Sequence, residues 1–458
     1  MTANSDEALQ ALQREVQQLL GRCLLRLQQY ERLIKAIMAD YEISGPAHAL
    51  EAVRAARMTA TAGKTLGTIV GELLGSYVVT NEVDTPIKAS TDTSDAHISI
   101  GSRLQLSDAD FARTEKDLRE LVLLRNNLVH HFIDQHDIGT LDGCRGGRDA
   151  LIAAANSPAA LAGEAAMQGL LNTCDTEENA PSKGLTITTD SFVSSPDGNT
   201  IKVQIIRPQT AERLPCVYYI HGGGMQSMSC FNGMYSSWGR IIAAQGVAVV
   251  MVDFRNALRP SSAPEVAPFP AGLNDCVSGL RWLHTQAAAL NIDPRRIVVA
   301  GESGGGNLSI ATILKLKQDG DLKLAKGLYA LCPYISGQWP LPQYPSSTEN
   351  NGLLLELHNN RGRMAYGIEA FEAKNPLAWP AFATANDVAG FPPTVISVNE
   401  CDPLRDEGIG FYRLLLQSGV RARCRQVMGT IHGTEVFSIT CPDISRDTAS
   451  DIANFCRD

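Results

Sequence analysis

The chain has 458 residues, of which 44% are hydrophobic and 19% charged, and its formal net charge at pH 7 is −9. This composition can build a sizeable core and is not that of a disordered chain. The net acidity argues against a protein that coats nucleic acids, so we expect no nucleic-acid partner. The longest apolar stretch, residues 241–252, is too short to cross a bilayer, and residues 1–10 lack the layout of a signal peptide.

The eleven cysteines are scattered along the chain, and no two of them form a C-x-x-C pair. An odd number of dispersed cysteines is typical of reduced thiols in a cytoplasm rather than of a disulfide framework or a zinc site. The sequence therefore predicts a soluble, cytoplasmic protein of more than one domain, with no membrane association and no bound metal.

The N-terminal part of the chain has a helical pattern. Apolar residues recur every three or four positions between residues 6 and 40, and a second helical stretch runs from about 46 to 79. Ser107 can cap a third helix, which has acidic residues in its first turn. We predict an all-helical bundle over residues 1–145.

The pattern changes after this bundle. Residues 146–184 read as an Ala-rich helical segment followed by a polar linker. From residue 185 to 458, short β-branched runs alternate with helical stretches. Such an alternation of apolar strands and helices predicts an α/β domain, with a mainly parallel sheet covered by helices on both faces.

The sharpest local motif is Gly301-Glu302-Ser303-Gly304-Gly305, which fits G-x-S-x-G between a predicted strand and a predicted helix. A nucleophilic serine is held on such a turn, where neighbouring glycines allow close backbone approach and the helix N-terminus favours negative charge. The alternative is a glycine-rich turn with an incidental serine.

A second glycine motif, His221-Gly222-Gly223-Gly224, directly follows another predicted strand. Glycines leave backbone N–H groups unshielded, so those of Gly223 and Gly224 can bind an oxyanion together with the N–H of Gly304. Taken alone, the motif also fits a flexible turn.

A serine nucleophile needs a base, and the base needs a carboxylate that orients it. Asp402 and His432 each follow a predicted strand late in the chain. Three nearby acids compete with Asp402 for the orienting role, namely Glu400, Asp406 and Glu407. We rank Asp402 first because Pro403 fixes the turn beside it.

These motifs resemble those of the hormone-sensitive-lipase-like carboxylesterases (bacterial family IV) over about residues 149–458. The match is carried by His221-Gly222-Gly223-Gly224, Gly301-Glu302-Ser303-Gly304-Gly305-Gly306-Asn307, Asp402-Pro403-Leu404-Arg405-Asp406-Glu407 and His432-Gly433. The resemblance implies an α/β-hydrolase fold without cofactor, in which Ser303 is the nucleophile, His432 the base and Asp402 its orienter. Gly223, Gly224 and Gly304 would line the oxyanion hole, and His221, Gly222, Gly301 and Glu302 would be structural parts of the motifs.

Three positions depart from the family's common pattern. Glu302 stands where the family usually has Asp, Gly304 where it has Ala, and Thr434 where it has Phe. None of these changes removes a catalytic atom, but they leave the acyl and alcohol preference open.

The family also implies a helical cap over the site. Residues 149–171 and an insertion at about 336–380 would supply it, and the insertion is rich in aromatic residues such as Trp339 and Trp379. Aromatic side chains in a cap would shape an apolar pocket and exclude water. The alternative is a surface insertion whose aromatic residues pack against one another.

Residues 6–140 more weakly resemble the HEPN superfamily of small helical domains. Arg125 and His130 fit its R-x(4–6)-H motif, which implies dimerisation and, in active members, metal-independent RNA cleavage with Arg125 binding phosphate and His130 acting as acid or base. The alternative is a packing and dimerisation module in which both residues lie on an ordinary helix surface.

The sequence as a whole thus predicts a serine carboxylesterase that acts on short-chain acyl esters through an acyl-enzyme. We expect a small-molecule ester as substrate and a homodimer as the assembly, with the helical module serving dimerisation or regulation. The alternatives are a non-catalytic, ligand-binding protein on the same fold and, for the first half, a HEPN-type RNase.

Overall fold

The computed structural model describes residues 2–40, 42–46, 49–80, 97–101, 103–155, 172, 174–352, 354–355, 357–358 and 360–457. Backbone contacts divide the chain into two compact units, Met1–Gly169 and Leu170–Asp458. We call them the helical unit and the hydrolase unit. The predicted division at residue 145 falls inside a helix, Leu141–Ala155, that packs within the helical unit.

The helical unit is built on a long first helix whose apolar face contacts the other helices. Its core includes Val16, Leu27, Leu121, Phe132 and Leu151, which are buried together. Ser107 caps the fourth helix as predicted, because its Oγ accepts a bond from Asp110 N at 3.2 Å. The helices are α1 (Thr2–Asp40), α2 (Leu50–Ala62), α3 (Leu66–Ser76), α4 (Asp108–Asn126), α5 (Phe132–Gln135) and α6 (Leu141–Ala155), with a π-helical turn η2 (Asn127–His131) between α4 and α5.

The expectation of an all-helical bundle misses four short strands in this unit. Strand β1 (Glu42–Pro46) pairs antiparallel with β3 (His97–Gly101), and β2 (Val78–Thr80) pairs parallel with β4 (Leu104–Leu106). Runs of β-branched residues such as Val78-Val79-Thr80 favour strands where they can pair with a neighbour. Those pairings join segments far apart in the sequence, so the local helical pattern did not reveal them.

The hydrolase unit contains one eight-stranded sheet in the order β12-β11-β10-β9-β7-β8-β6-β5. Strand β6 alone runs in the direction opposite to the other seven strands, so the predicted mainly parallel sheet is confirmed. The carboxyl ends of β7, β9, β11 and β12 therefore meet at one edge. The strands are β5 (Leu185–Val193), β6 (Thr200–Pro208), β7 (Leu214–Ile220), β8 (Ala248–Val252), β9 (Ile292–Glu302), β10 (Gly327–Leu331), β11 (Thr394–Cys401) and β12 (Ala422–Ile431).

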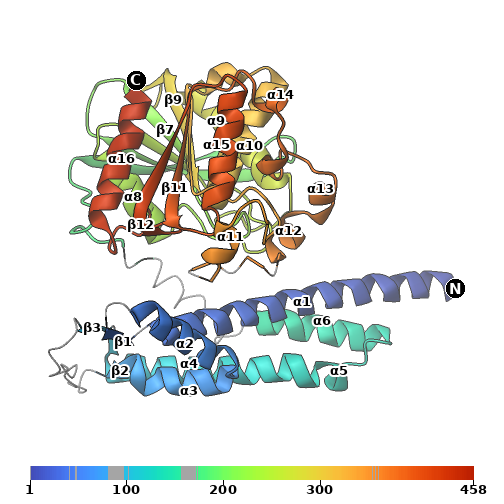
Figure 1. The fold of residues 1–458 in the computed structure, drawn as a ribbon. Helices are drawn as coiled ribbons and strands as arrows, with labels where there is room; N and C mark the ends of the chain where they lie inside the picture. Colours follow the sequence, from blue (N-terminus) through green and yellow to red (C-terminus); the bar gives the residue numbers. More distant parts are fainter. Residues whose placement is uncertain are drawn as a thin grey trace. The chain divides into compact units, whose positions relative to one another are not determined.

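Helices cover both faces of this sheet (Figure 1). Every residue of β7 and β8 is buried, which explains their continuous apolar runs. One face carries α9 (Ala271–Gln286), α10 (Gly304–Asp319) and α15 (Arg405–Gln417), and the other carries α8 (Gly233–Ala243) and α16 (Pro442–Arg457). Short helices η3 (Leu322–Leu324) and α14 (Ala385–Val388) lie in connecting segments.

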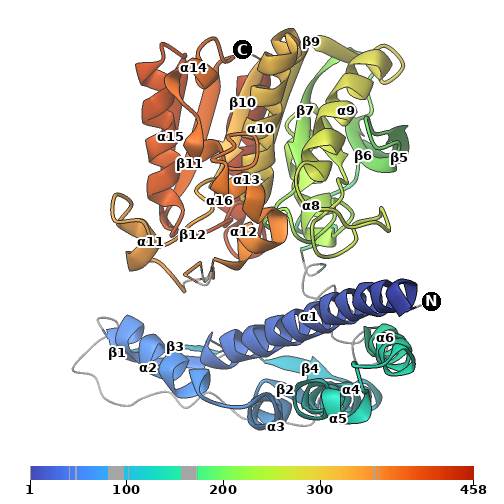
Figure 2. The same ribbon diagram turned by 90° about the vertical axis from the view of Figure 1, so that its right-hand side faces the viewer.

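The predicted insertion forms α11 (Ser346–Glu349), α12 (Arg361–Tyr366), α13 (Ile368–Glu372) and η4 (Pro380–Phe382), and Figure 2 shows α11 and α12 near one end of the sheet. Its large aromatic residues pack against one another. Trp339 and Trp379 are 1% and 0% exposed, and the Trp339 ring stacks on Tyr334 at 4.6 Å between centroids. Of the other predicted cap segment, residues 149–155 belong to α6 and 156–171 lie outside the described residues.

Candidate active site

Ser303 lies on a sharp turn between β9 and α10. Its φ of 57° and ψ of −120° are unusual for a residue with a side chain, and such strain is characteristic of a serine held in a nucleophile elbow. Gly301 permits this turn, because a Cβ there would come within 2.5 Å of the Ile220 carbonyl oxygen. The motif thus has the strand–turn–helix setting that the sequence predicted.

The structure brings Ser303, His432 and Asp402 together at the carboxyl ends of β9, β12 and β11. His432 Nε2 lies 2.9 Å from Ser303 Oγ, and His432 Nδ1 lies 2.8 Å from Asp402 Oδ2. The other oxygen of Asp402 accepts a bond from Leu404 N at 2.9 Å, which fixes the carboxylate. An imidazole held between a hydroxyl and a carboxylate in this way can take the hydroxyl proton.

Two opposing effects act on the pKa of His432. Burial by itself would lower the pKa of the imidazole, but the Asp402 carboxylate, together with the nearby Cys332, outweighs burial and raises the pKa of His432 well above its usual value. Asp402 is fully buried and His432 is 6% exposed, so solvent screens their attraction little. This pairing stabilises the imidazolium that forms when the histidine accepts a proton.

The three acids that competed with Asp402 have other contacts. Glu400 accepts a bond from Gly429 N at 2.6 Å, and Asp406 accepts one from Ser346 N at 2.7 Å. Glu407 accepts bonds from Ile335 N and from the indole N–H of Trp339, both at 2.7 Å, and so ties the insertion to α15. This anchoring contact was not predicted from the sequence.

The glycine motif after β7 lies directly against the elbow. Gly223 and Gly224 have φ values of 93° and 63°, which only glycine adopts readily. A Cβ on Gly304 would come within 2.7 Å of Gly224 N and within 2.6 Å of Met225 N. The two motifs thus pack directly against each other, and the glycine at position 304 allows the loop to approach more closely than an alanine would.

Glu302 links the two motifs through a buried carboxylate. It accepts hydrogen bonds from the hydroxyl groups of Tyr219 and Tyr235 at 2.7 and 2.6 Å and from Gly222 N at 2.8 Å. Burial raises the pKa of Glu302 to about 7 in spite of these donors. The sequence identified Glu302 only as a structural motif residue. Its partners lie 67 to 83 positions away in the chain, so no local pattern could find them.

His221 is fully buried and contacts the loop instead of the serine. Its ring stacks on Phe254 at 4.2 Å between centroids, and its Nδ1–H donates to the Gly222 carbonyl at 2.9 Å. Its Nε2 lies 3.8 Å from Asp253. Burial lowers the pKa of His221 below its usual value, so a neutral ring shapes the glycine loop.

Two further residues complete this region. Asn307, from the same motif as Ser303, donates to the carbonyls of Tyr334 and Ala378 at 2.9 and 3.0 Å and thereby joins α10 to the insertion.

Cys332 Sγ lies within 4.8 Å of donor atoms of Asp402 and His432, a spacing that metal ligands can have. Both ring nitrogens of His432 already contact Asp402 and Ser303, so we assign no metal to this cluster.

The pair predicted in the helical unit is also in contact. Arg125 Nη1 lies 3.2 Å from His130 Nε2, and Arg125 is partly buried whereas His130 is exposed. The π-helical turn Asn127–His131 adds a residue to the helix between them, and such turns often occur at functional sites.

Among the helices that the structure describes, none combines the length and the apolar character needed to span a bilayer. A family model described as the alpha/beta hydrolase fold matches residues 217–436. Carboxylesterase NlhH of Mycobacterium tuberculosis is 33% identical over 250 residues, which cover 54% of this chain and 74% of the relative.

Two solved structures extend this likeness. Esterase Est22, solved with p-nitrophenol, is 65% identical with a TM-score of 0.65, and the match covers 67% of this chain and 91% of that one. Brefeldin A esterase, described as a bacterial homologue of human hormone-sensitive lipase, is 37% identical with a TM-score of 0.58, covering 64% and 82%. The chain belongs to the hormone-sensitive-lipase-like α/β-hydrolase family and is a carboxylic ester hydrolase.

Proposed function

We propose that the protein hydrolyses short-chain acyl esters through an acyl-enzyme on Ser303, with His432 as the base and Asp402 as its orienter. The observation that carries this proposal is the chain of contacts from Ser303 Oγ through His432 to Asp402, at 2.9 and 2.8 Å. These distances are within hydrogen-bond reach, as proton transfer requires.

The reaction proceeds in two halves. Neutral His432 takes the proton of Ser303 as Oγ attacks the ester carbonyl, and the oxyanion is bound by the N–H groups of Gly223, Gly224 and Gly304. The imidazolium then gives its proton to the departing alcohol. Water, activated by His432, attacks the acyl-enzyme, and the acid leaves as Ser303 regains its proton.

We base the preference for small acyl groups on the packing beside the glycine loop that contains Gly223 and Gly224. Gln226 Nε2 donates to the Gly224 carbonyl at 3.2 Å. A Cβ on Gly362 of α12 would come within 1.8 Å of the Tyr334 hydroxyl and 3.4 Å of Gln226 Nε2. The insertion thus packs tightly onto residues next to the loop, which favours short acyl chains.

The test is hydrolysis of p-nitrophenyl esters from acetate to palmitate by the wild type and by Ser303→Ala. We expect the highest kcat/KM on acetate or butyrate and a loss of at least about a thousandfold in the variant, because removal of a triad member has such effects. Circular dichroism should show an unchanged fold. A variant with near wild-type rates, or a wild type that prefers palmitate, would contradict the proposal.

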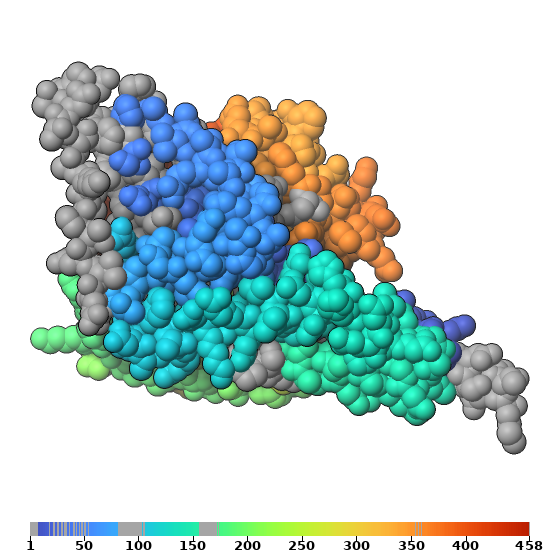
Figure 3. Space-filling view, turned by 90° about the horizontal axis from the view of Figure 1, so that it is seen from below, coloured from blue at the N-terminus to red at the C-terminus, as the bar shows by residue number. Residues whose placement is uncertain are grey.

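The proposal also assigns dimerisation to the helical unit. Leu123, Val129 and Ile133 lie on the run from α4 to α5 and are 64%, 44% and 69% exposed. Exposed large apolar side chains favour an interface between copies, and Figure 3 shows the surface made by α4 to α6. A second copy of this chain is the partner we expect there.

A further inference from the structure

A cavity of about 370 Å³ opens at the edge of the sheet opposite to Ser303. Apart from Phe455 of α16, its lining residues precede or begin β10, β11 and β12, whereas Asp402 and His432 follow β11 and β12. An eight-residue strand separates the two edges by roughly 20 Å, given a rise of about 3.3 Å per residue. The cavity is therefore no part of the ester site.

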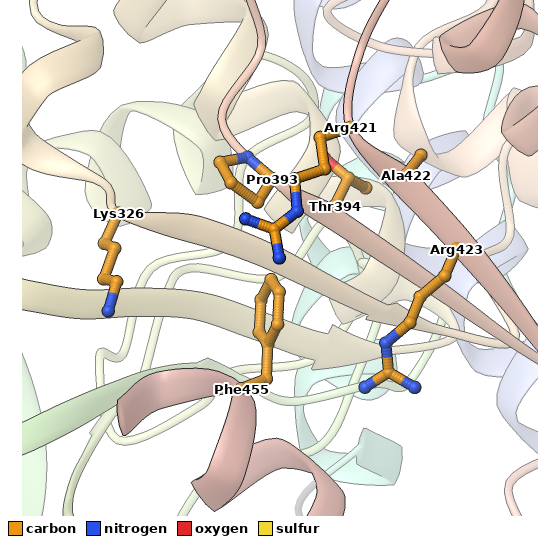
Figure 4. A pocket seen from close by; sticks show the side chains of 7 residues that line it. All are labelled: Lys326, Pro393, Thr394, Arg421, Ala422, Arg423 and Phe455. Carbon is orange, nitrogen blue, oxygen red and sulfur yellow. The ribbon is translucent and has the colours of Figure 1, made fainter. Parts of the chain in front are cut away.

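Three cationic side chains surround this cavity. Lys326, Arg421 and Arg423 come from two different segments and point into the same space (Figure 4). Asp451 lies 2.7 Å from Arg423 and offsets its charge. Arg421 has no ion pair or side-chain hydrogen bond with any described residue, and Lys326 has only a 3.5 Å contact with the Arg457 carbonyl oxygen. Two positive charges thus remain without a balancing acid among the described residues that line the cavity.

An aromatic ring lies between these cations. Phe455 of α16 contributes its ring to the cavity wall and packs edge-on against Tyr329, with 6.0 Å between the centroids. Position 327 has to be glycine for this placement, because a Cβ on Gly327 would lie 2.7 Å from the Phe455 ring. The ring thus lies beside Lys326 and Arg421 in the cavity wall (Figure 4), and Pro393 adds a second apolar wall.

We propose that this cavity binds a small phosphorylated molecule that carries a flat apolar group. The phosphate would bind the guanidinium of Arg421 and the ammonium of Lys326, because arginine presents a planar set of donors that matches phosphate oxygens and lysine adds a point charge. The flat group would stack on Phe455. The volume is in the range of ordinary small-molecule sites.

The test is calorimetric titration of the full-length protein with phenyl phosphate and with inorganic phosphate. We expect saturable binding of both and tighter binding of phenyl phosphate. The double variant Lys326→Ala/Arg421→Ala should bind phenyl phosphate at least about tenfold more weakly, because two charge-assisted contacts are lost. Arg446→Ala, which removes an exposed arginine elsewhere on α16, is the matched control and should bind like the wild type. Hydrolysis of p-nitrophenyl acetate should stay within about twofold in all variants.

A second variant tests the aromatic wall. Phe455→Leu keeps an apolar side chain but removes the ring, so phenyl phosphate should lose its advantage over inorganic phosphate. The proposal is overturned if the wild type shows no saturable binding, if the double variant binds as well as the wild type, or if Phe455→Leu keeps the full preference. It is also overturned if phenyl phosphate competes with the chromogenic ester, since the ligand would then occupy the ester site.

Discussion

At the scale of single residues, Glu302, which precedes Ser303, makes contacts that the G-x-S-x-G motif does not indicate. Glu302 holds Gly222 N at 2.8 Å and is itself held by Tyr219 and Tyr235. The carboxylate therefore fixes the start of the glycine loop relative to the elbow. An ionised carboxylate can accept all three bonds, whereas a protonated one must use one oxygen as a donor.

We predict that Glu302→Gln lowers kcat by about tenfold at pH 8.5 and by much less at pH 6, because a bond to a charged acceptor contributes about 1.5 kcal/mol or more. Burial raises the pKa of Glu302 to about 7, so at pH 6 the wild-type side chain is mostly neutral and resembles glutamine. The measurement is the ratio of wild-type to variant kcat on p-nitrophenyl butyrate at both pH values. The effect of His432 on the pH profile cancels in that ratio.

A neighbouring acid supplies the control. Glu400 lies on the same edge of the sheet but accepts its bond from Gly429 N, away from the glycine loop. Glu400→Gln should give the same ratio at both pH values. If the ratio of wild-type to Glu302→Gln kcat were equal at pH 6 and 8.5, the charge on Glu302 would not be what fixes the glycine loop.

At the scale of elements, Glu407 joins α15 to the inserted segment. It accepts bonds from Ile335 N, Ser336 N and the Trp339 indole at 2.7, 3.2 and 2.7 Å. Burial nevertheless raises the pKa of Glu407 to about 7. Between about pH 4.5 and 7 the folded state keeps this proton while the unfolded state releases it, so the free energy of unfolding falls as the pH rises through that window.

We predict that Glu407→Gln makes the free energy of unfolding less dependent on pH. From pH 5 to pH 7.5 the wild type should lose about 2 to 3 kcal/mol more than the variant, given about 1.4 kcal/mol per unit of pKa shift. Urea unfolding of the hydrolase unit, followed by tryptophan fluorescence, measures this difference. Parallel pH curves for the two proteins would contradict the assigned ionisation of Glu407.

The apolar strands of the hydrolase unit, the turn at Ser303 and the fold class could be predicted from the sequence. Each of them has a local sequence pattern. The run of apolar residues in β7 predicts a buried strand, and the glycines around Ser303 predict a tight turn. The short strands β1 to β4 and the packing of Trp379 depend on partners distant in the chain. The same holds for Glu302 and Glu407, whose contacts only the folded chain defines.

At the scale of the whole molecule, the family model matches residues 217–436, which all lie in the hydrolase unit. The match to Est22 covers 67% of this chain, so about a third of the chain lies outside that match. The helical unit has its own buried clusters, around Leu121 and around Ile69. It is thus a packed addition to an esterase, for which we propose a role in assembly.

We predict that the wild type is a dimer and that Leu123→Glu/Ile133→Glu is a monomer, because two buried charges without partners would destabilise an apolar interface. Light scattering after size exclusion gives the mass of each protein. Leu416→Glu, which changes an exposed leucine of α15 in the hydrolase unit, is the control and should stay dimeric. A monomeric wild type or a dimeric double variant would contradict this role.

We propose that Ser303 is activated by His432 and becomes covalently modified during the reaction. Diethyl p-nitrophenyl phosphate tests it most directly, since an activated serine attacks its phosphorus and releases p-nitrophenolate. We predict one equivalent of p-nitrophenolate and, by mass spectrometry of peptides, a diethyl phosphate group on Ser303, with neither in His432→Ala. Labelling at another residue, or equally fast labelling of Ser303 in His432→Ala, would contradict the account.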